Sequence, residues 1–152
     1  MTEKFEKGWE YVKKNEGGYI DDEDDSGGAT KYGISLRFLK GLDIEEGDVN
    51  DDNKINEEDI KDLDEEKAKE LYYVHFWLPP KCEEINDTRV AIKLFDMCVN
   101  FGVGGGAKVI QRAVNSNYDY NKLTVDGKIG KASLSAINTL GYHLMSDIPK
   151  NW

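Results

Sequence analysis

The sequence is poor in cysteine, in proline and in positive charge, and each shortage excludes a class of protein. The chain of 152 residues has two cysteines and three prolines, too few for a disulfide scaffold or a proline-rich disordered segment. Cys82 and Cys98 also lack the spacing of a zinc site, so we expect two buried free thiols. No apolar run approaches the roughly 20 residues of a membrane-spanning helix, so no membrane span is expected.

Acidic residues outnumber basic ones by 30 to 20, and the excess is local. The segment from Asp43 to Glu70 holds 14 acidic residues and four lysines, whereas the remainder is neutral. An acidic chain is repelled by phosphate backbones, so we expect no binding to nucleic acid. The N-terminus lacks the apolar segment of a secretory signal, so we expect synthesis in the cytoplasm, that of a host if the gene is viral.

Length and composition are typical of one compact domain, which we expect to span residues 1–152 as a monomer. Apolar residues recur at helical spacing, as at Phe5, Trp9 and Val12. We expect helices over residues 5–16, 35–40, 64–78, 88–101, 107–115 and 131–140, with a break at 102–106. Residues 19–34 predict a β-hairpin or an irregular lobe. The predicted fold class is therefore mainly α, a helical bundle with a small N-terminal β-hairpin lobe.

Three polar residues near the N-terminus suit the cleavage of a glycosidic bond. Glu16 continues the apolar stripe of the first helix, where burial raises the pKa of a carboxyl group, although a solvated helix end is the alternative. Asp25 lies in a polar, glycine-rich segment that keeps a carboxylate ionised. A glycosidase needs one protonated carboxyl and one ionised carboxylate, and the hydroxyl of Thr30 can position the attacking water.

Four ordered blocks of sequence carry a family resemblance. They are Glu16-Gly17-Gly18-Tyr19 followed by Asp25 to Ile34, Tyr72-x-x-x-Phe76-Trp77, Phe95-Asp96-x-x-Val99-Asn100-x-Gly102, and Val125-Asp126-Gly127-x-Ile129-Gly130. The blocks resemble glycoside hydrolase family 108, the N-acetylmuramidases of phage endolysins and bacterial secretion-activator proteins. The last block is similar to a turn in the family's predicted peptidoglycan-binding portion, about residues 100–140 here.

The resemblance implies an α+β lysozyme-like fold and cleavage of the β-1,4 bond between N-acetylmuramic acid and N-acetylglucosamine. The partner would be bacterial peptidoglycan, in the cell wall or periplasm, and catalysis would need no cofactor. By position Glu16 is the general acid, and Asp25 and Thr30 resemble its partners in phage-type lysozymes. Alternatives are a lytic transglycosylase, which uses a single Glu, and a wall-binding module without activity.

The same resemblance suggests residues for sugar binding. These are Tyr19, Asp96 and Asn100, for which a buried hydrogen-bond network is the competing interpretation. The aromatic residues Tyr72, Phe76 and Trp77 are expected in the core rather than in a sugar platform.

An inserted acidic segment, residues 48–59, has the ligand spacing of a calcium loop. It resembles the EF-hand loop and, more closely, its dockerin variant, with Asn53 where glycine is expected. Asparagine also tolerates a left-handed backbone, so we expect a structural Ca²⁺ here, with a solvated acidic loop as the alternative. A dockerin-type adhesion domain would need two such loops. The expected ligands are Asp48, Asn50, Asp52, the carbonyl oxygen of Lys54, Asn56 and Asp59.

Overall fold

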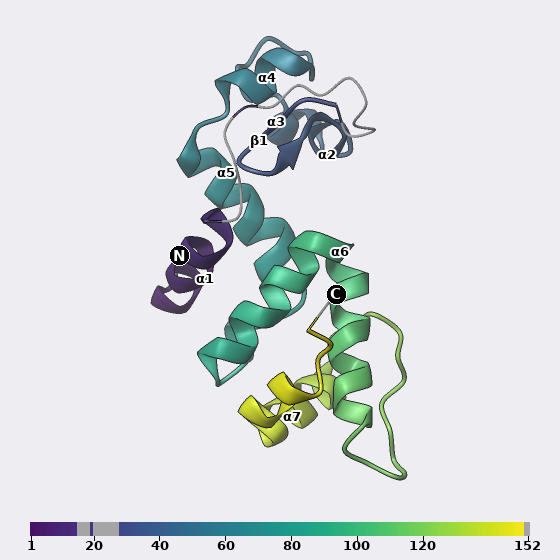
Figure 1. The fold of residues 1–152 in the computed structure, drawn as a ribbon. Coiled ribbons are helices and arrows are strands. Elements are labelled where there is room, and N and C mark those ends of the chain that lie inside the picture. Colours follow the sequence, from purple (N-terminus) through teal and green to yellow (C-terminus); the bar gives the residue numbers. More distant parts are fainter. Residues whose placement is uncertain (15–18, 20–27, 151–152) are drawn as a thin grey trace. The chain divides into compact units, whose positions relative to one another are not determined.

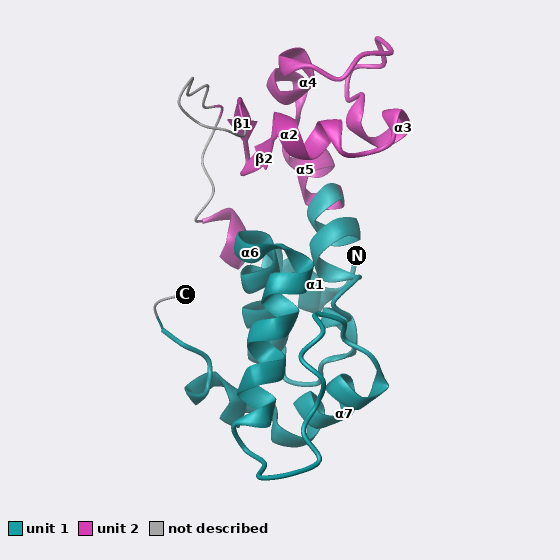
Figure 2. Cartoon of the chain, turned by 90° about the vertical axis from the view of Figure 1, so that its right-hand side faces the viewer, with its two compact units in different colours: residues 1–10, 71–152 teal, residues 11–70 magenta. Residues whose placement is uncertain are grey.

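The computed structural model describes residues 1–14, 19 and 28–150, and these form two compact units (Figures 1 and 2). Unit 1 comprises residues 1–10 and 71–152, and unit 2 comprises residues 11–70. The expectation of a single domain stays a prediction, and each unit is described by itself. Of the predicted site residues, Glu16 and Asp25 lie outside the described residues.

Unit 1 is built from helices around an aromatic core. Its elements are the start of α1 (Glu3–Lys13), η1 (Tyr73–Trp77), η2 (Cys82–Glu84), α6 (Thr88–Asn115), α7 (Lys131–Leu140) and η3 (Gly141–Ser146). The ring of Trp77 packs edge-to-face on those of Phe5 and Phe95, with centroids 5.4 and 5.3 Å away. Tyr72 and Trp77 are buried, so the prediction that they belong to the core is confirmed for these two, whereas Phe76 is half-buried.

The predicted break in the helix is present, but it is confined to Gly102 and does not extend over residues 102–106. Only Gly102 leaves the helical conformation, with φ of 81°, and α6 continues on both sides of the resulting kink. The later glycines are helical, and one of them allows close packing: a Cβ on Gly106 would lie 2.8 Å from the sulfur of Cys98. Gly102 therefore separates two helical segments at a kink in α6, and the later glycines belong to the second segment (Figure 1).

By length and composition alone, α6 is the one helix in the described part of the chain that is long and apolar enough to cross a membrane. Its apolar side chains, among them Val90, Leu94 and Ile110, are buried in the core of unit 1. A buried core helix passes the same test, so this feature is weak evidence for a span.

Unit 2 combines short helices with a two-stranded sheet. Its elements are β1 (Thr30–Lys31), β2 (Ile34–Ser35), α2 (Leu36–Lys40), α3 (Ile44–Gly47), α4 (Glu57–Asp62) and most of α5 (Glu65–Tyr72). The strands pair antiparallel, with Thr30 opposite Ser35, across a two-residue turn whose residues both have positive φ. This is the geometry of a tight hairpin, and the predicted β-hairpin is confirmed.

The ends of the helices follow local capping chemistry. The hydroxyl of Ser35 accepts a hydrogen bond from the amide of Phe38 at 3.0 Å, and a carboxylate oxygen of Asp64 accepts one from the amide of Lys67 at 2.8 Å. These caps place the starts of α2 and α5 close to where the sequence predicts them. The helical run of α5 continues through the wider turns of η1, and α7 has the predicted bounds.

Candidate functional site

Two of the predicted site residues in the described part of unit 2 lie near the β-hairpin. Thr30 is half-buried on β1, and Tyr19 is 37% exposed. The ammonium group of Lys61 lies 5.9 Å from the centre of the Tyr19 ring, within the range of a cation–π contact. Lys31 donates a hydrogen bond of 2.8 Å to the carbonyl oxygen of Lys61. Lys61 of helix α4 thus contacts both Tyr19 and β1.

The other two predicted sugar-binding residues, Asp96 and Asn100, lie one turn apart on α6 in unit 1. Asp96 is 8% exposed, and the amide of Asn100 donates to its backbone carbonyl at 2.8 Å and to its carboxylate at 3.2 Å. Burial raises the pKa of Asp96, and Lys93 and the Asn100 hydrogen bond oppose this effect only in part. Burying the ionised carboxylate of Asp96 costs free energy. Such a buried carboxylate is compatible with sugar binding, and it is equally compatible with a hydrogen-bond network that only supports the fold.

We expect Asp96→Asn to raise the free energy of unfolding at pH 7. Because the folded protein raises the pKa of Asp96, this residue stabilises the fold below its unfolded pKa, and that contribution is lost as the pH rises through the folded pKa. The gain from the substitution should therefore shrink near pH 3, below the ordinary Asp pKa of about 3.9. Urea unfolding at both pH values measures the difference.

The exposed Asp119→Asn is the matched control for Asp96→Asn, because it removes the same charge from unit 1. If Asp96→Asn is no more stable than this control at pH 7, the conclusion that folding raises the pKa of Asp96 is wrong. If Asp96 also binds sugar, the stabilised variant should lose about tenfold or more in activity, the typical effect of losing a hydrogen bond to a charged group. A pure packing network predicts unchanged activity.

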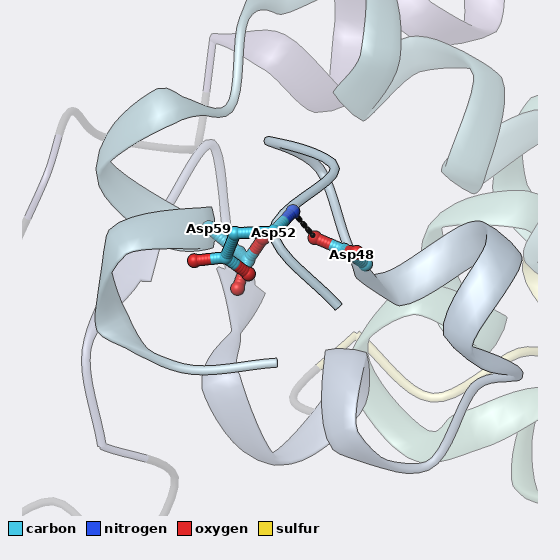
Figure 3. A group of neighbouring side chains, drawn as sticks. All are labelled: Asp48, Asp52 and Asp59. Carbon is cyan, nitrogen blue, oxygen red and sulfur yellow. Dashed lines mark hydrogen bonds between the residues drawn. The ribbon is translucent and has the colours of Figure 1, made fainter. Parts of the chain in front are cut away.

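The inserted acidic segment joins α3 to α4 and gathers three of its predicted ligands (Figure 3). One carboxylate oxygen from each of Asp48, Asp52 and Asp59 lies within 4.8 Å of the other two. Two oxygens bound to one Ca²⁺ at about 2.4 Å can be at most about 4.8 Å apart, so the spacing fits a shared cation. Without a cation, three carboxylates this close repel one another.

Backbone amides hold these carboxylates in place. Asp48 accepts hydrogen bonds from the amides of Asp52 at 3.1 Å and Asn53 at 2.7 Å, so the loop wraps around the carboxylate (Figure 3). Asp59 is fully buried and accepts from the amides of Val49 and Asn56, both at 2.8 Å. Asn53 has φ of 66°, the left-handed backbone expected at the position where calcium loops usually carry glycine.

The other three predicted ligands, Asn50, Asn56 and Lys54, differ in the hydrogen bonds that they make. The side-chain oxygen of Asn50 is buried and has no hydrogen-bond partner among the described residues, although its amide donates to Asp62 at 3.2 Å. A buried oxygen without a partner is costly, and a cation would satisfy it. The side-chain oxygen of Asn56 instead caps α4, by accepting from the amide of Glu58 at 3.0 Å. Lys54 donates its amide to Asp52 at 2.9 Å.

Both cysteines belong to unit 1, and the prediction of buried free thiols is confirmed. Burial raises the pKa of the Cys98 thiol to about 12 and that of Cys82 well above its usual value. A thiol that stays protonated at neutral pH is a poor nucleophile and a poor metal ligand. We therefore expect neither thiol to act as a nucleophile or a metal ligand.

The sequence analysis missed Lys61, which approaches Tyr19, and Lys31, which donates a hydrogen bond to the Lys61 carbonyl. Lys61 follows the inserted segment, and Lys31 stands next to Thr30, so both are close in sequence to predicted site residues. No spacing rule connects Lys61 with Tyr19 or with Lys31, and the contact between Lys61 and Lys31 depends on how α4 packs on β1.

A family model described as Glycosyl hydrolase 108 matches residues 9–102. The chain belongs to this family. The matched range contains Glu16, Tyr19, Asp25, Thr30, Asp96 and Asn100, all the predicted catalytic and sugar-binding residues. As a glycosyl hydrolase 108 protein, the chain is a glycoside hydrolase, and the family implies peptidoglycan as its substrate.

A solved structure, that of SagA from Brucella abortus, is similar to this chain along most of its length. The two are 26% identical and superpose with a TM-score of 0.76, over 94% of this chain and 74% of the SagA chain. This similarity confirms the predicted mainly α, lysozyme-like fold class of the glycosyl hydrolase 108 chain. Comparison with curated proteins gives no match.

Proposed function

We propose that the protein is an N-acetylmuramidase that cleaves the β-1,4 bond between N-acetylmuramic acid and N-acetylglucosamine in peptidoglycan. The observation that carries this proposal is the family match over residues 9–102, which includes both carboxylates that such a reaction needs. The protein would be made in the cytoplasm and act on the cell wall or periplasm, as a phage endolysin or a secretion activator.

In this proposal Glu16 protonates the oxygen of the leaving sugar, and Asp25 stays ionised to stabilise the positive charge that develops on the sugar ring. Thr30 orients the attacking water. Its place on a paired strand supports this role, because β1 and β2 limit the movement of its backbone. A lytic transglycosylase is less favoured, because it uses one Glu and no water, which would leave Asp25 and Thr30 without a function.

The test is mass spectrometry of the fragments that the protein releases from purified peptidoglycan, after borohydride reduction. Reduced muramic acid ends support the muramidase. Anhydro-muramic acid ends indicate a transglycosylase, and reduced glucosamine ends indicate cleavage of the other glycosidic bond. A protein that pellets with the wall and releases nothing is a wall-binding module, and the proposed activity is then wrong.

We further propose that residues 48–59 bind one structural Ca²⁺ through oxygens of Asp48, Asn50, Asp52 and Asp59, with the Lys54 carbonyl and Asn56 as further candidates. The gathered carboxylates and the buried, unpartnered oxygen of Asn50 support this proposal. The ion would hold α3 against α4 rather than take part in catalysis, because glycosidic cleavage by two carboxylates needs no metal.

Calcium should raise the melting temperature of the protein relative to a chelator. At a concentration one hundred times the Kd, binding to the folded state alone contributes about 2.7 kcal/mol of stability. Differential scanning calorimetry measures the shift and isothermal titration measures the affinity. Asp52→Asn should weaken binding, whereas its neighbour Asp51→Asn removes the same charge and should not. Identical melting curves with calcium and with chelator would contradict the site.

A further inference from the structure

The ammonium group of Lys31, on β1, is bonded to the main chain and not to a carboxylate. Unit 2 has 20 acidic and nine basic residues, so a lysine in this unit has many carboxylates within its neighbourhood. Lys31 forms no ion pair with any residue that the structure describes. It donates a hydrogen bond of 2.8 Å to the carbonyl oxygen of Lys61. This contact therefore depends on the packing of β1 on α4, not on the general negative charge of unit 2.

The carbonyl group that accepts this hydrogen bond lies at the end of a helix. Lys61 is the penultimate residue of α4. Carbonyl groups in the last turn of a helix have no amide partner inside that helix, and a lysine ammonium is a suitable donor to them. Lys31 thus satisfies a backbone group of α4, and the bond joins β1 to α4.

Helix α4 is itself held firmly in unit 2. Its residue Ile60 and the following Leu63 are 0% and 1% exposed. A capping box fixes its start: the side chain of Asn56 accepts from the amide of Glu58 at 3.0 Å, and that of Asp59 accepts from the amide of Asn56 at 2.8 Å. A side chain that is bonded to α4 is therefore bonded to the core of unit 2.

The hairpin that Lys31 joins to α4 is too small to be stable by itself. Two residue pairs, Thr30 with Ser35 and Lys31 with Ile34, make up the pairing of β1 and β2. An isolated two-stranded hairpin is at best marginally stable in water. On the other side, β2 leads directly into α2, whose first amide, that of Leu36, donates to the carbonyl of Ala29 at 2.9 Å. The bond from Lys31 to α4 is the corresponding support of β1.

Thr30 depends on this support because it precedes Lys31 on the same strand. Successive side chains of a strand point to opposite faces. A shift of the pairing by one residue would turn the hydroxyl of Thr30 to the other face of the hairpin. The bond from Lys31 to α4 opposes such a shift, because the ammonium group would lose its acceptor. It therefore fixes the direction of the Thr30 side chain.

The same end of α4 also contacts Tyr19. The ammonium group of Lys61 lies 5.9 Å from the centre of the Tyr19 ring, whereas Lys31 bonds to the main-chain carbonyl of Lys61. The two contacts use different atoms of Lys61, so both exist together. The last turn of α4 therefore contacts one predicted site residue directly and supports another, Thr30, through Lys31.

We propose that Lys31 is a positioning residue of the muramidase site. By bonding to α4 it fixes β1, so that the hydroxyl of Thr30 faces the attacking water. The proposal rests on the proposed function, from which it takes the role of Thr30. The family resemblance assigns no role to Lys31. In this proposal Lys31 does not touch the reacting atoms, because its ammonium group is bonded to α4.

Lys31→Met should lower kcat for the release of fragments from purified peptidoglycan by about tenfold to a hundredfold, since a small misplacement of a positioned group has an effect of this size. Methionine keeps most of the length of lysine but cannot donate the hydrogen bond. Pelleting with the wall should not change. Lys31→Arg can donate to the same carbonyl and should restore most of the rate. The control Lys40→Met removes an exposed lysine of α2 in unit 2 and should act like the wild type.

A double-mutant cycle separates positioning from general support of the fold. Thr30→Val removes the hydroxyl group that Lys31 is proposed to position, and it keeps the shape of the side chain. In the Thr30→Val background, Lys31→Met should therefore lower kcat by no more than about twofold. An equal effect of Lys31→Met in both backgrounds would overturn the proposal. So would an unchanged kcat of Lys31→Met, or a Lys31→Arg variant as slow as Lys31→Met.

Hydrogen–deuterium exchange gives a second measurement that needs no catalysis. Lys31→Met should speed the exchange of amides in residues 30–35 by about tenfold or more relative to Lys40→Met, because a charge-assisted hydrogen bond is lost. Amides of α6 in unit 1 should keep their wild-type rates. Unchanged exchange in the hairpin, or faster exchange throughout the chain, would overturn the proposal. A wild type that releases no fragments would refute the muramidase, and the exchange rates would still test the bond between Lys31 and α4.

Discussion

Glu16→Gln should lower kcat for the release of reduced muramic acid ends from peptidoglycan by about 10³-fold, within the usual range for loss of a general acid. Glutamine has almost the same size as glutamate but cannot donate the proton that the leaving sugar oxygen requires. Binding to the wall should change little, because the substitution preserves the shape of the side chain. Turnover of purified peptidoglycan, measured as new reducing ends, gives the rate.

The control is Glu3→Gln, which removes one charge from an exposed position near the start of α1. It should leave the rate within twofold of the wild type. If the Glu16→Gln protein keeps more than a tenth of the wild-type activity, Glu16 is not the general acid. The most useful next step would then be the same substitution at the other candidate carboxylate, Asp25→Asn.

Trp77→Ala should cost about 3 to 5 kcal/mol of unfolding free energy, the usual range for deleting a buried aromatic side chain. Trp77 is fully buried, it packs against Phe5 and Phe95, and its indole nitrogen donates to Glu83 at 2.8 Å. Since domains are typically stable by only about 5 to 15 kcal/mol, the variant should be close to unfolding at room temperature. Urea titration followed by circular dichroism measures the loss.

Tyr120→Ala is the matched control for Trp77→Ala, because Tyr120 is an aromatic residue of unit 1 that is 77% exposed. Its substitution should change the unfolding free energy by no more than about 0.5 kcal/mol. Trp77→Phe should fall between the two, since it keeps an aromatic ring and loses the hydrogen bond to Glu83. A cost below about 1 kcal/mol for Trp77→Ala would mean that Trp77 is not part of the core of unit 1.

The helices could be predicted where the pattern is local. Asp64 caps α5, Ser35 caps α2 and α7 has its predicted bounds, because capping and apolar spacing act within a few residues. The glycine run correctly predicted a break, which lies at Gly102, but it did not predict that residues 103–106 are helical. Only the packing of Gly106 on Cys98 shows that this glycine serves close contact inside a helix.

The predicted calcium loop, residues 48–59, could be predicted in part from the sequence. Alternating ligand types at fixed spacing made residues 48–59 recognisable, and folding brings Asp48, Asp52 and Asp59 together as the spacing requires. The buried oxygen of Asn50 is not visible in the sequence, because burial depends on the helices that flank the loop. The spacing therefore indicated the ligands. The packing of the loop buries the side-chain oxygen of Asn50, and this is the separate observation that supports an ion.

The sequence by itself determined the family, the concentration of acidic residues in one segment and the identity of the carboxylates proposed for catalysis. These are properties of residue type and order along the chain. Only the tertiary structure decided that Lys61 meets Tyr19, that Asp96 is buried, and that Lys31 donates to the end of α4. Each of these joins residues from different elements or depends on what covers them, and the free energy of such contacts comes from packing that no local pattern specifies.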